Sequence, residues 1–297
     1  MTISFHHHFR NGDHIINNVL DKLAEMGFKN LTLAASSLSA VHAPLIEHIR
    51  SGLITHIETS GLRGELAEQI SRGLMDFPVV FRSHGGRASA IRSGELHIDV
   101  AFLGAPSCDP YGNANGYSRD DDDGISCGSL GYARTDAEFA DKVIIITNNI
   151  VSYPNAPWAI PEHDVDYVVR VDDIGDPKGI MSGATRYTKD PKELLIAKTA
   201  ANVVEAAGYL YDGFSMQMGS GGASLATARF IRQKMLDKGI RCRFALGGIT
   251  GQITAMHEEG LIDRVLDVQS FDLDAAKSLK NNHFPVSYTH LRAHETL

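Results

Sequence analysis

The stretch R-F-A-L-G-G-I-T-G-Q-I-T-A-M-H-E-E, residues 243–259, carries the pattern that decides the fold. Residues 243–246 are predicted to form a buried strand, and the glycines at 247, 248 and 251 form a turn behind it. Residues 251–259 then place apolar side chains three and four apart, as one face of an amphipathic helix does. A strand, a turn and a helix in this order are the repeating unit of an α/β fold with a parallel sheet.

The same alternation extends over most of the chain. Helices are predicted at 15–26, 43–51, 64–74, 190–207, 223–238, 251–259 and 273–281. Strands are predicted at 31–35, 54–59, 79–82, 98–103, 143–147, 167–171, 214–218, 243–246 and 265–268, after an opening strand that includes 1–5. Asp190 and Pro191 mark the clearest helix start, because the carboxylate can cap backbone N–H groups and the proline presets φ. We predict one α/β domain over 1–284, with a mostly parallel open sheet and helices on both faces.

Composition and charge exclude several classes of function. Of the 297 residues, 43% are hydrophobic, which supplies a full core. The net charge of -8 argues against binding to nucleic acid or to an anionic membrane surface. Three cysteines without a C-x-x-C spacing indicate neither a disulfide framework nor a zinc site. Because no apolar run approaches the roughly 18 residues needed to cross a bilayer, we expect a cytoplasmic protein.

Three glycine-rich turns that follow predicted strands are the candidate ligand site. Open α/β sheets bind ligands where loops leave the carboxyl ends of strands, and glycine lets backbone N–H groups approach a negative charge closely. The candidate substrate-binding residues in these turns are His84, Gly85, Gly86, Arg87, Gly219, Ser220, Gly221, Gly222, Gly247, Gly248 and Thr250. The alternative is that the glycines only make tight turns. No turn matches a dinucleotide or P-loop motif.

Several charged and nucleophilic residues are further candidates for a site, and each has an alternative reading. The guanidinium of Arg87 can grip a carboxylate with two hydrogen bonds, and the alternative is a surface arginine beside a structurally paired histidine. His6 and His8 are predicted to share one face of the first strand, and a metal site there is the weaker reading, so no metal is expected. Gly124 to Gly128 matches a nucleophile elbow but follows an acidic loop, which excludes a serine hydrolase. Asp120 to Asp123 is interpreted as a solvated part of a long loop over 106–131.

Both ends of the chain require separate treatment. Residues 1–5 look like a strand already under way, which suggests that native sequence is missing upstream. Residues 285–297 change abruptly in character and resemble translated adapter sequence, so we expect a non-native tail there.

Several long motifs resemble the citrate lyase alpha subunit family. They are S-F-H-H-H-F-R-N-G-D (4–13), G-L-R-G (61–64), R-S-H-G-G-R (82–87), A-P-S-C-D-P-Y-G-N-A-N-G (105–116), C-G-S-L-G-Y-A (127–133), I-G-D-P-K (174–178), S-G-A-T-R (182–186) and A-L-G-G-I-T-G-Q (245–252). The likeness runs from Ser4 to about Phe284. The pattern around Gln217, Met218 and Gly219 also resembles the wider group of coenzyme A transferases, which adds Gln217 to the candidate substrate-binding residues.

The resemblance implies exchange of the acyl group on an acyl-carrier thioester, in which acetate leaves and citrate takes its place. It implies no covalently bound cofactor, because the coenzyme A-like arm belongs to an acyl carrier subunit or arrives as free acetyl-CoA. The implied partners are citrate, the acetyl thioester, the acyl carrier subunit and a citryl-cleaving lyase subunit, within an oligomer. The chemistry requires a cationic grip on citrate and backbone N–H groups aimed at the thioester oxygen.

The fold resembles the first half of a coenzyme A transferase, whose acyl-accepting glutamate lies in a second half that this chain lacks. We therefore assign no catalytic nucleophile, and we expect the isolated chain to be weakly active or inactive. One rival reading is a coenzyme A transferase or acyl-CoA hydrolase for another small acid. A rival of another class is a non-catalytic carboxylate-binding or assembly domain.

Overall fold

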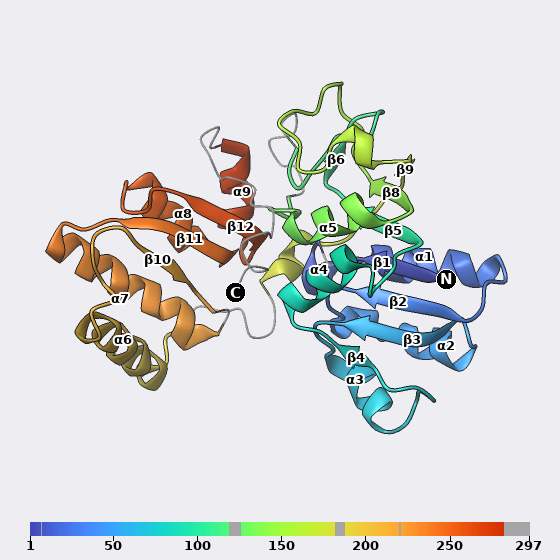
Figure 1. Cartoon of the computed structure of the whole chain (residues 1–297), viewed down its shortest axis with the longest axis horizontal. Coiled ribbons are helices and arrows are strands. Elements are labelled where there is room, and N and C mark those ends of the chain that lie inside the picture. Colours follow the sequence, from blue (N-terminus) through green and yellow to red (C-terminus); the bar gives the residue numbers. More distant parts are fainter. Residues whose placement is uncertain (7, 119–125, 182–187, 220, 282–297) are drawn as a thin grey trace. The chain divides into compact units, whose positions relative to one another are not determined.

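The computed structural model describes residues 1–6, 8–118, 126–181, 188–219 and 221–281. They form two compact units, one within residues 1–179 and one within residues 180–281 (Figure 1). The single domain predicted over 1–284 therefore consists of two units, each with its own sheet. Among the described helices, none combines the length and apolar character that a membrane span requires.

Unit 1 is built on a seven-stranded sheet in the order β4-β3-β2-β1-β5-β8-β9, and every neighbouring pair in it is parallel. Its strands are β1 (Thr2–Phe5), β2 (Leu31–Ala35), β3 (Ile54–Thr59), β4 (Val80–Phe81), β5 (Val100–Gly104), β8 (Lys142–Thr147) and β9 (Tyr167–Arg170). The chain first moves outward from β1 to β4 and then returns to β5 on the other side of β1. This makes β1 and β5 the point where the direction of winding reverses.

Helices cover both faces of this sheet, as predicted (Figure 1). They are α1 (Ile15–Glu25), α2 (Leu45–Arg50), α3 (Gly64–Ser71), α4 (His84–Ser93) and α5 (Gly131–Phe139), with short 3-10 turns at Arg10–Gly12, Ala40–His42, Glu162–Asp164 and Pro177–Ile180. In β1, Ser4 faces α4 and α5, while its neighbour Phe5 faces the opposite way and stacks on Phe102, 5.3 Å between ring centroids. Successive residues of a strand point to opposite faces, so this alternation seals both sides of the sheet.

Unit 2 has a smaller parallel sheet in the order β10-β11-β12. Its strands are β10 (Phe214–Gln217), β11 (Cys242–Ile249) and β12 (Val265–Ser270), and its helices are α6 (Pro191–Ala206), α7 (Gly222–Lys238), α8 (Gly251–Glu258) and α9 (Leu273–Asn281). The core contains Phe214, Ile231, Met235, Ala245 and Val265, all nearly inaccessible. Asp190 accepts a hydrogen bond from the Lys192 N–H at 2.9 Å and Pro191 opens α6, which confirms the predicted helix start.

The predictions missed α4 and α5, which lie in glycine-rich sequence. Ser83 caps α4 by accepting a hydrogen bond from the Gly86 N–H at 2.9 Å, and Gly94 ends it at φ 79°. The turn predicted at 83–87 is thus mostly the first turn of a helix. The described part of the loop predicted at 106–131 is mostly without helix or strand, but it contains a buried antiparallel hairpin of β6 (Ser107–Cys108) and β7 (Ala114–Asn115) that was not predicted.

Candidate active site

The carboxyl ends of β1 and β5 are the place where a doubly wound sheet opens for a ligand. The chain leaves β1 through His6 and reaches α1 only at Ile15. β1 ends at Phe5, so the histidines predicted on the first strand follow it instead; His7 lies outside the described residues. Two of these histidines meet at the end of β5.

His6 and His8 both contact the end of β5 at Gly104. His6 Nε2 donates to the Gly104 carbonyl at 3.0 Å, and a Cβ at Gly104 would lie 2.6 Å from the ring of His8. Burial, followed by the nearby His8, lowers the pKa of His6 to about 4. Burial also lowers the pKa of His8, so both rings are neutral at pH 7. The glycine provides the space in which His8 lies.

Asp13 links His8 to a second imidazole. His42 Nε2 donates to Asp13 Oδ2 at 3.3 Å, and Asp13 Oδ1 lies 3.5 Å from His8 Nδ1. The proton of His42 is on Nε2, because Nδ1 accepts from the Ser39 N–H at 2.9 Å. Burial alone would raise the pKa of Asp13, but the hydrogen bond donated by His42 and the electrostatic attraction of the two imidazole rings outweigh it and lower that pKa. The result is a buried His-Asp-His arrangement beside the carboxyl ends of β1 and β5, where the direction of winding reverses.

A cationic pair lies beside this arrangement. Arg10 has a left-handed backbone, φ 54°, which few residues other than glycine adopt. Burial and then the charge of Arg63 lower the pKa of Arg10 to about 10, so the two guanidinium groups are near enough to repel each other. Arg63 is placed by the G-L-R-G turn, in which the Leu38 N–H donates to the Gly61 carbonyl at 2.8 Å and the Arg63 N–H donates to the Leu38 carbonyl at 3.1 Å. Two neighbouring positive charges suit a ligand with several carboxylates.

The loop that carries Arg10 is held by the I-G-D-P-K segment. Asp176 N–H donates to the Gly12 carbonyl at 2.8 Å, and a Cβ at Gly12 would lie 1.9 Å from the Asp176 carbonyl oxygen. Gly179 approaches Gly12 as closely, 2.1 Å from a built Cβ to the Gly12 nitrogen. Only glycines permit this approach, which fixes the backbone on the carboxyl side of Arg10.

Besides both ring nitrogens of His8, two buried polar atoms at the same edge of the sheet lack a hydrogen-bond partner among the described residues. They are Ser60 Oγ, directly after β3, and Asn148 Oδ1, directly after β8. Buried polar groups are rarely left unsatisfied, so these atoms favour the presence of a polar ligand or water at this edge.

Arg87, predicted to grip a substrate carboxylate, is 3% exposed and paired inside the protein. Its Nη1 and Nη2 donate to the two oxygens of Asp136 on α5 at 2.9 and 2.6 Å, and Nη2 also donates to Ser4 Oγ at 3.0 Å. Ser4 in turn donates to Asp136. The guanidinium therefore joins α4, α5 and β1, which is a structural arrangement.

The other predicted residues of the first turn lie near the surface. His84 is exposed at the start of α4 and lies against Tyr132, 5.1 Å between ring centroids. Burial raises the pKa of Tyr132 to about 12. Gly85 and Gly86 form the first turn of α4, where backbone N–H groups face outward from the helix start.

The second and third predicted turns meet in unit 2, because β10 and β11 are parallel neighbours. Gln217 contacts Gly247, whose built Cβ lies 3.0 Å from Gln217 Nε2, and Gly247 has φ 100°. Gly219 N–H donates to Ser224 Oγ at 2.9 Å, while Gly221 and Gly222 start α7 and Thr250 caps α8. The ring of Phe271 packs against Gly248, and Ser220 lies outside the described residues.

Asp267 is the most perturbed acid near these turns, and sequence reasoning missed it. It lies on β12 opposite Gly247, is 1% exposed, and accepts from Ser270 Oγ at 2.8 Å. Burial raises its pKa to about 7. No sequence signal marks this position, since a lone aspartate in V-L-D-V looks like an outward-facing strand residue.

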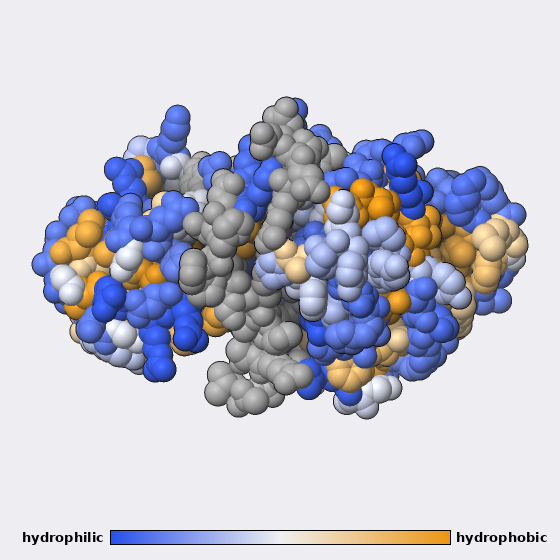
Figure 2. All heavy atoms as spheres, turned by 90° about the horizontal axis from the view of Figure 1, so that it is seen from above, coloured by the Kyte–Doolittle hydropathy of each residue, from blue (hydrophilic) through white to orange (hydrophobic). Residues whose placement is uncertain are grey.

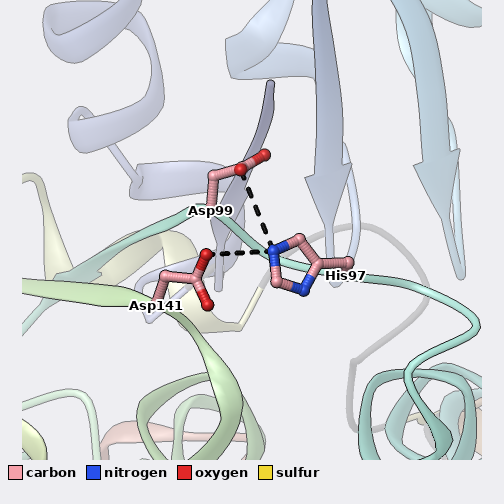
Figure 3. Close-up of side chains that lie close together, drawn as sticks. All are labelled: His97, Asp99 and Asp141. Atoms are coloured by element: carbon pink, nitrogen blue, oxygen red, sulfur yellow. Dashed lines mark hydrogen bonds and ion pairs between the residues drawn. The ribbon is translucent and has the colours of Figure 1, made fainter.

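His97, Asp99 and Asp141 gather at the amino edge of the seven-stranded sheet, opposite the site described above (Figure 3). His97 Nε2 lies 3.8 Å from Asp99 and 3.0 Å from Asp141, and Asp99 also accepts from the Thr2 N–H at 2.5 Å. All three are partly or largely exposed, and their contacts are those of a surface ion-pair cluster.

Comparisons with known proteins identify the family. Residues 1–291 match the family model described as "Citrate lyase, alpha subunit (CitF)". The chain is 58% identical over 289 residues to the citrate lyase alpha chain of Haemophilus influenzae and 57% identical over 289 residues to that of Escherichia coli. These alignments cover 97% of this chain and 57% and 56% of the two relatives, so the chain spans about half the length of the curated relatives it matches.

Solved structures give the same answer for the fold. The putative alpha subunit of citrate lyase from Streptococcus mutans, solved in complex with citrate, superposes with a TM-score of 0.89 at 56% identity, over 95% of this chain and 55% of that one. A malonate decarboxylase alpha subunit from Acinetobacter baumannii superposes with a TM-score of 0.64 at 18% identity. The match covers 92% of this chain and 49% of that one. A 4-hydroxybutyrate CoA-transferase from Porphyromonas gingivalis superposes with a TM-score of 0.57 at 17% identity, over 97% of this chain and 64% of that one. The last two show the fold alone, which is that of coenzyme A transferases.

Proposed function

Because this chain belongs to the citrate lyase alpha subunit family, we propose that the whole protein transfers an acyl-carrier thioester from acetate to citrate. The products are acetate and the citryl thioester. The observation that carries the proposal is the 58% identity to a citrate lyase alpha chain, together with the Arg10 and Arg63 pair at the sheet edge where such folds bind ligands.

In the proposed reaction a citrate carboxylate oxygen attacks the carbonyl carbon of the acetyl thioester, and the carrier sulfur leaves as thiolate. The thiolate then attacks the citryl carbonyl of the mixed anhydride and releases acetate, so atoms and charge balance. Arg10 and Arg63 hold citrate carboxylates, and the neutral His8, oriented by Asp13, hydrogen-bonds the bound acid. Exclusion of water protects the anhydride.

The glycine turns of unit 2 remain the proposed site for the thioester. Gly219, Gly221 and Gly222 precede α7, and Gly247, Gly248 and Thr250 precede α8. Backbone N–H groups at the start of α7 can stabilise a developing oxyanion. At the start of α8 the Gly251 N–H already donates to the Asp272 carboxylate at 2.9 Å, so this turn supplies space more than free N–H groups. The coenzyme A-like arm arrives on the carrier partner or as acetyl-CoA, and a citryl-cleaving subunit consumes the product within a cytoplasmic oligomer.

Calorimetric titration of citrate tests the cationic pair. We expect Arg10→Gln and Arg63→Gln each to weaken citrate binding at least about ten-fold, because each removes a charge-assisted hydrogen bond worth roughly 1.5–3 kcal/mol. Arg92→Gln is the matched control, since that side chain is exposed on α4 beside Phe139. Equal citrate affinity in all three variants would show that citrate does not bind at this edge of the sheet.

Turnover separates the proposal from its rivals. The protein extended to the length of its relatives is mixed with acetyl-CoA and a panel of small acids, and acetate release is followed. Citrate should be the preferred acceptor. Preference for another acid favours a different transferase, hydrolysis without an acceptor favours a thioesterase, and citrate binding without turnover favours a non-catalytic domain.

A further inference from the structure

One face of the seven-stranded sheet lacks a helix over half of its width. Crossovers between parallel strands are right-handed, so helices on the way from β1 to β4 lie on one face and those on the way back lie on the other. α1 and α2 therefore cover β1 to β3 from one side, while α4 and α5 cover the centre from the other. Within the part of the chain that the structure describes, no helix covers β5, β8 and β9 on the α1 side (Figure 1).

Strand β8 shows the difference between the two faces directly. Val143 and Ile145, which point toward the α4 and α5 side, are 1% and 0% exposed. Ile144 points the other way and remains partly exposed. On the next strand Val169 pairs with Ile146 and is 42% exposed. The uncovered face is thus as apolar as the covered one.

This face forms the floor of a groove of about 520 Å³ beside α1. The floor consists of Phe102, Ile144, Ile146, Val169 and Val171, and the wall is α1 from Ile15 to Met26. The groove therefore follows the helix over its full length. β9, at the edge of unit 1 in Figure 1, faces the viewer in Figure 2, where apolar atoms gather on that unit.

The rim of the groove is acidic. Asp21, Glu25 and Asp173 line it, against one lysine, Lys22. Lys22 pairs with Glu25 at 2.6 Å, and the other two carboxylates contact histidines, Asp173 with His14 at 2.6 Å and Asp21 with His48 at 3.0 Å. With these imidazoles neutral, the rim keeps a net negative charge. A segment that lies in the groove is therefore favoured when apolar side chains face the floor and basic side chains flank them.

We propose that this groove is the docking site for an amphipathic helix with basic flanks, supplied by the polypeptide that the relatives carry outside the matched region. The alignment covers 57% of the Haemophilus influenzae relative, so more than two fifths of that relative's length has no counterpart here. An apolar groove as long as α1, in a fold that elsewhere covers its sheet with helices, fits one further helix packed beside α1.

Thiol labelling tests the proposal. Val169→Cys is placed in this chain and in the same chain extended by the unmatched segments of the Haemophilus influenzae relative, and the reaction with a maleimide dye is timed. The native cysteines Cys108, Cys127 and Cys242 are buried and add little background. We expect labelling to slow at least ten-fold in the extended protein and to remain slow on dilution to the monomer. Ala24→Cys, on the solvent side of α1, should react equally fast in both.

Other results would overturn the proposal. Equal labelling rates in the two proteins mean that the groove stays open. Concentration-dependent protection in the short chain identifies a second copy as the occupant, and protection that requires an added carrier or lyase subunit identifies another protein. If Val169→Cys disturbs the edge strand, Ile144→Cys on the floor gives the same comparison.

The charge of the occupant is tested by Glu25→Lys in the extended protein. A basic flank is repelled by the new lysine, so we expect labelling of Val169→Cys to become at least three-fold faster than with Glu25 in place. An unchanged or slower rate would show that the helix flanks are not basic.

Discussion

At the scale of single residues, the ion pair between Arg87 and Asp136 dominates the interior of unit 1. Both side chains are at most 4% exposed, and the guanidinium makes two hydrogen bonds to the carboxylate. Removing one partner of such a pair leaves a buried charge, which costs roughly 3–5 kcal/mol. Arg87→Met should therefore lower the free energy of unfolding by about that amount in urea denaturation.

The double variant Arg87→Met/Asp136→Leu distinguishes a structural arginine from a substrate-binding one. It removes both charges, so most of the lost stability should return. Arg92→Met on the exposed side of α4 is the control and should change stability by less than about 1 kcal/mol. If the double variant is stable but loses citrate binding while Arg10→Gln does not, Arg87 has the role first predicted for it.

Asp267 gives unit 2 a pH dependence of its own. Its pKa is raised to about 7 in the folded protein, above the ordinary value of 3.8, mainly by burial. The folded state then holds a proton that the unfolded state has lost, so stability falls as pH rises from about 4 to about 7 and then levels off. Asp267→Asn removes this loss, so it should raise the free energy of unfolding by up to about 4 kcal/mol at pH 7 and above.

Melting temperatures of Asp267→Asn and the parent protein at several pH values provide the measurement. The advantage of the variant should be small near pH 4, grow up to about pH 7 and stay constant to pH 8. An advantage that does not change with pH would mean that Asp267 is ionised in the folded state over this range.

At the scale of elements, the glycine turns of unit 2 are held by packing. A Cβ at Gly248 would lie 1.9 Å from the Phe271 ring, so Gly248→Ala forces that ring out of its place in the packing. Overpacking of this kind costs roughly 1–3 kcal/mol or more. Gly221 has φ -74° and open space around a built Cβ, so Gly221→Ala is the matched control. Urea denaturation of both variants should show a loss for Gly248→Ala alone.

The elements that sequence predicts well are those with a strong apolar period. The helices at 15–25 and 191–206 and the strands of both sheets were predicted to within a few residues. α4 was missed because His84-Gly85-Gly86 is a poor helix former, and the cap at Ser83 together with burial of Arg87 outweighs that propensity. Tertiary contacts across 49 residues, from Arg87 to Asp136, cannot be read from local pattern.

At the scale of the whole molecule, the two units each have a sheet and a core. We expect differential scanning calorimetry to show two transitions. Arg87→Met should lower only the transition of unit 1 and Gly248→Ala only that of unit 2, because each perturbation is confined to one core. A single transition shifted by both variants would show that the units unfold together.

The candidate site was predicted only in part. Sequence pattern located the glycine turns after strands, and the structure brings the second and third together at one edge of unit 2. It did not identify Arg10, Arg63, Asp13 or His42, although three of them lie in polar runs directly after predicted strands. Their grouping depends on the order β3-β2-β1-β5, and strand order is not encoded in periodicity.

The left-handed backbone of Arg10 has a consequence for laboratory evolution. A residue with a side chain at φ 54° is strained by roughly 1 kcal/mol, and glycine at that position would release the strain. A library selected for heat resistance alone would thus accumulate Arg10→Gly, whereas a library selected for growth on citrate would discard it. On the proposed function, the backbone strain at Arg10 is retained because glycine would remove the cation that binds citrate.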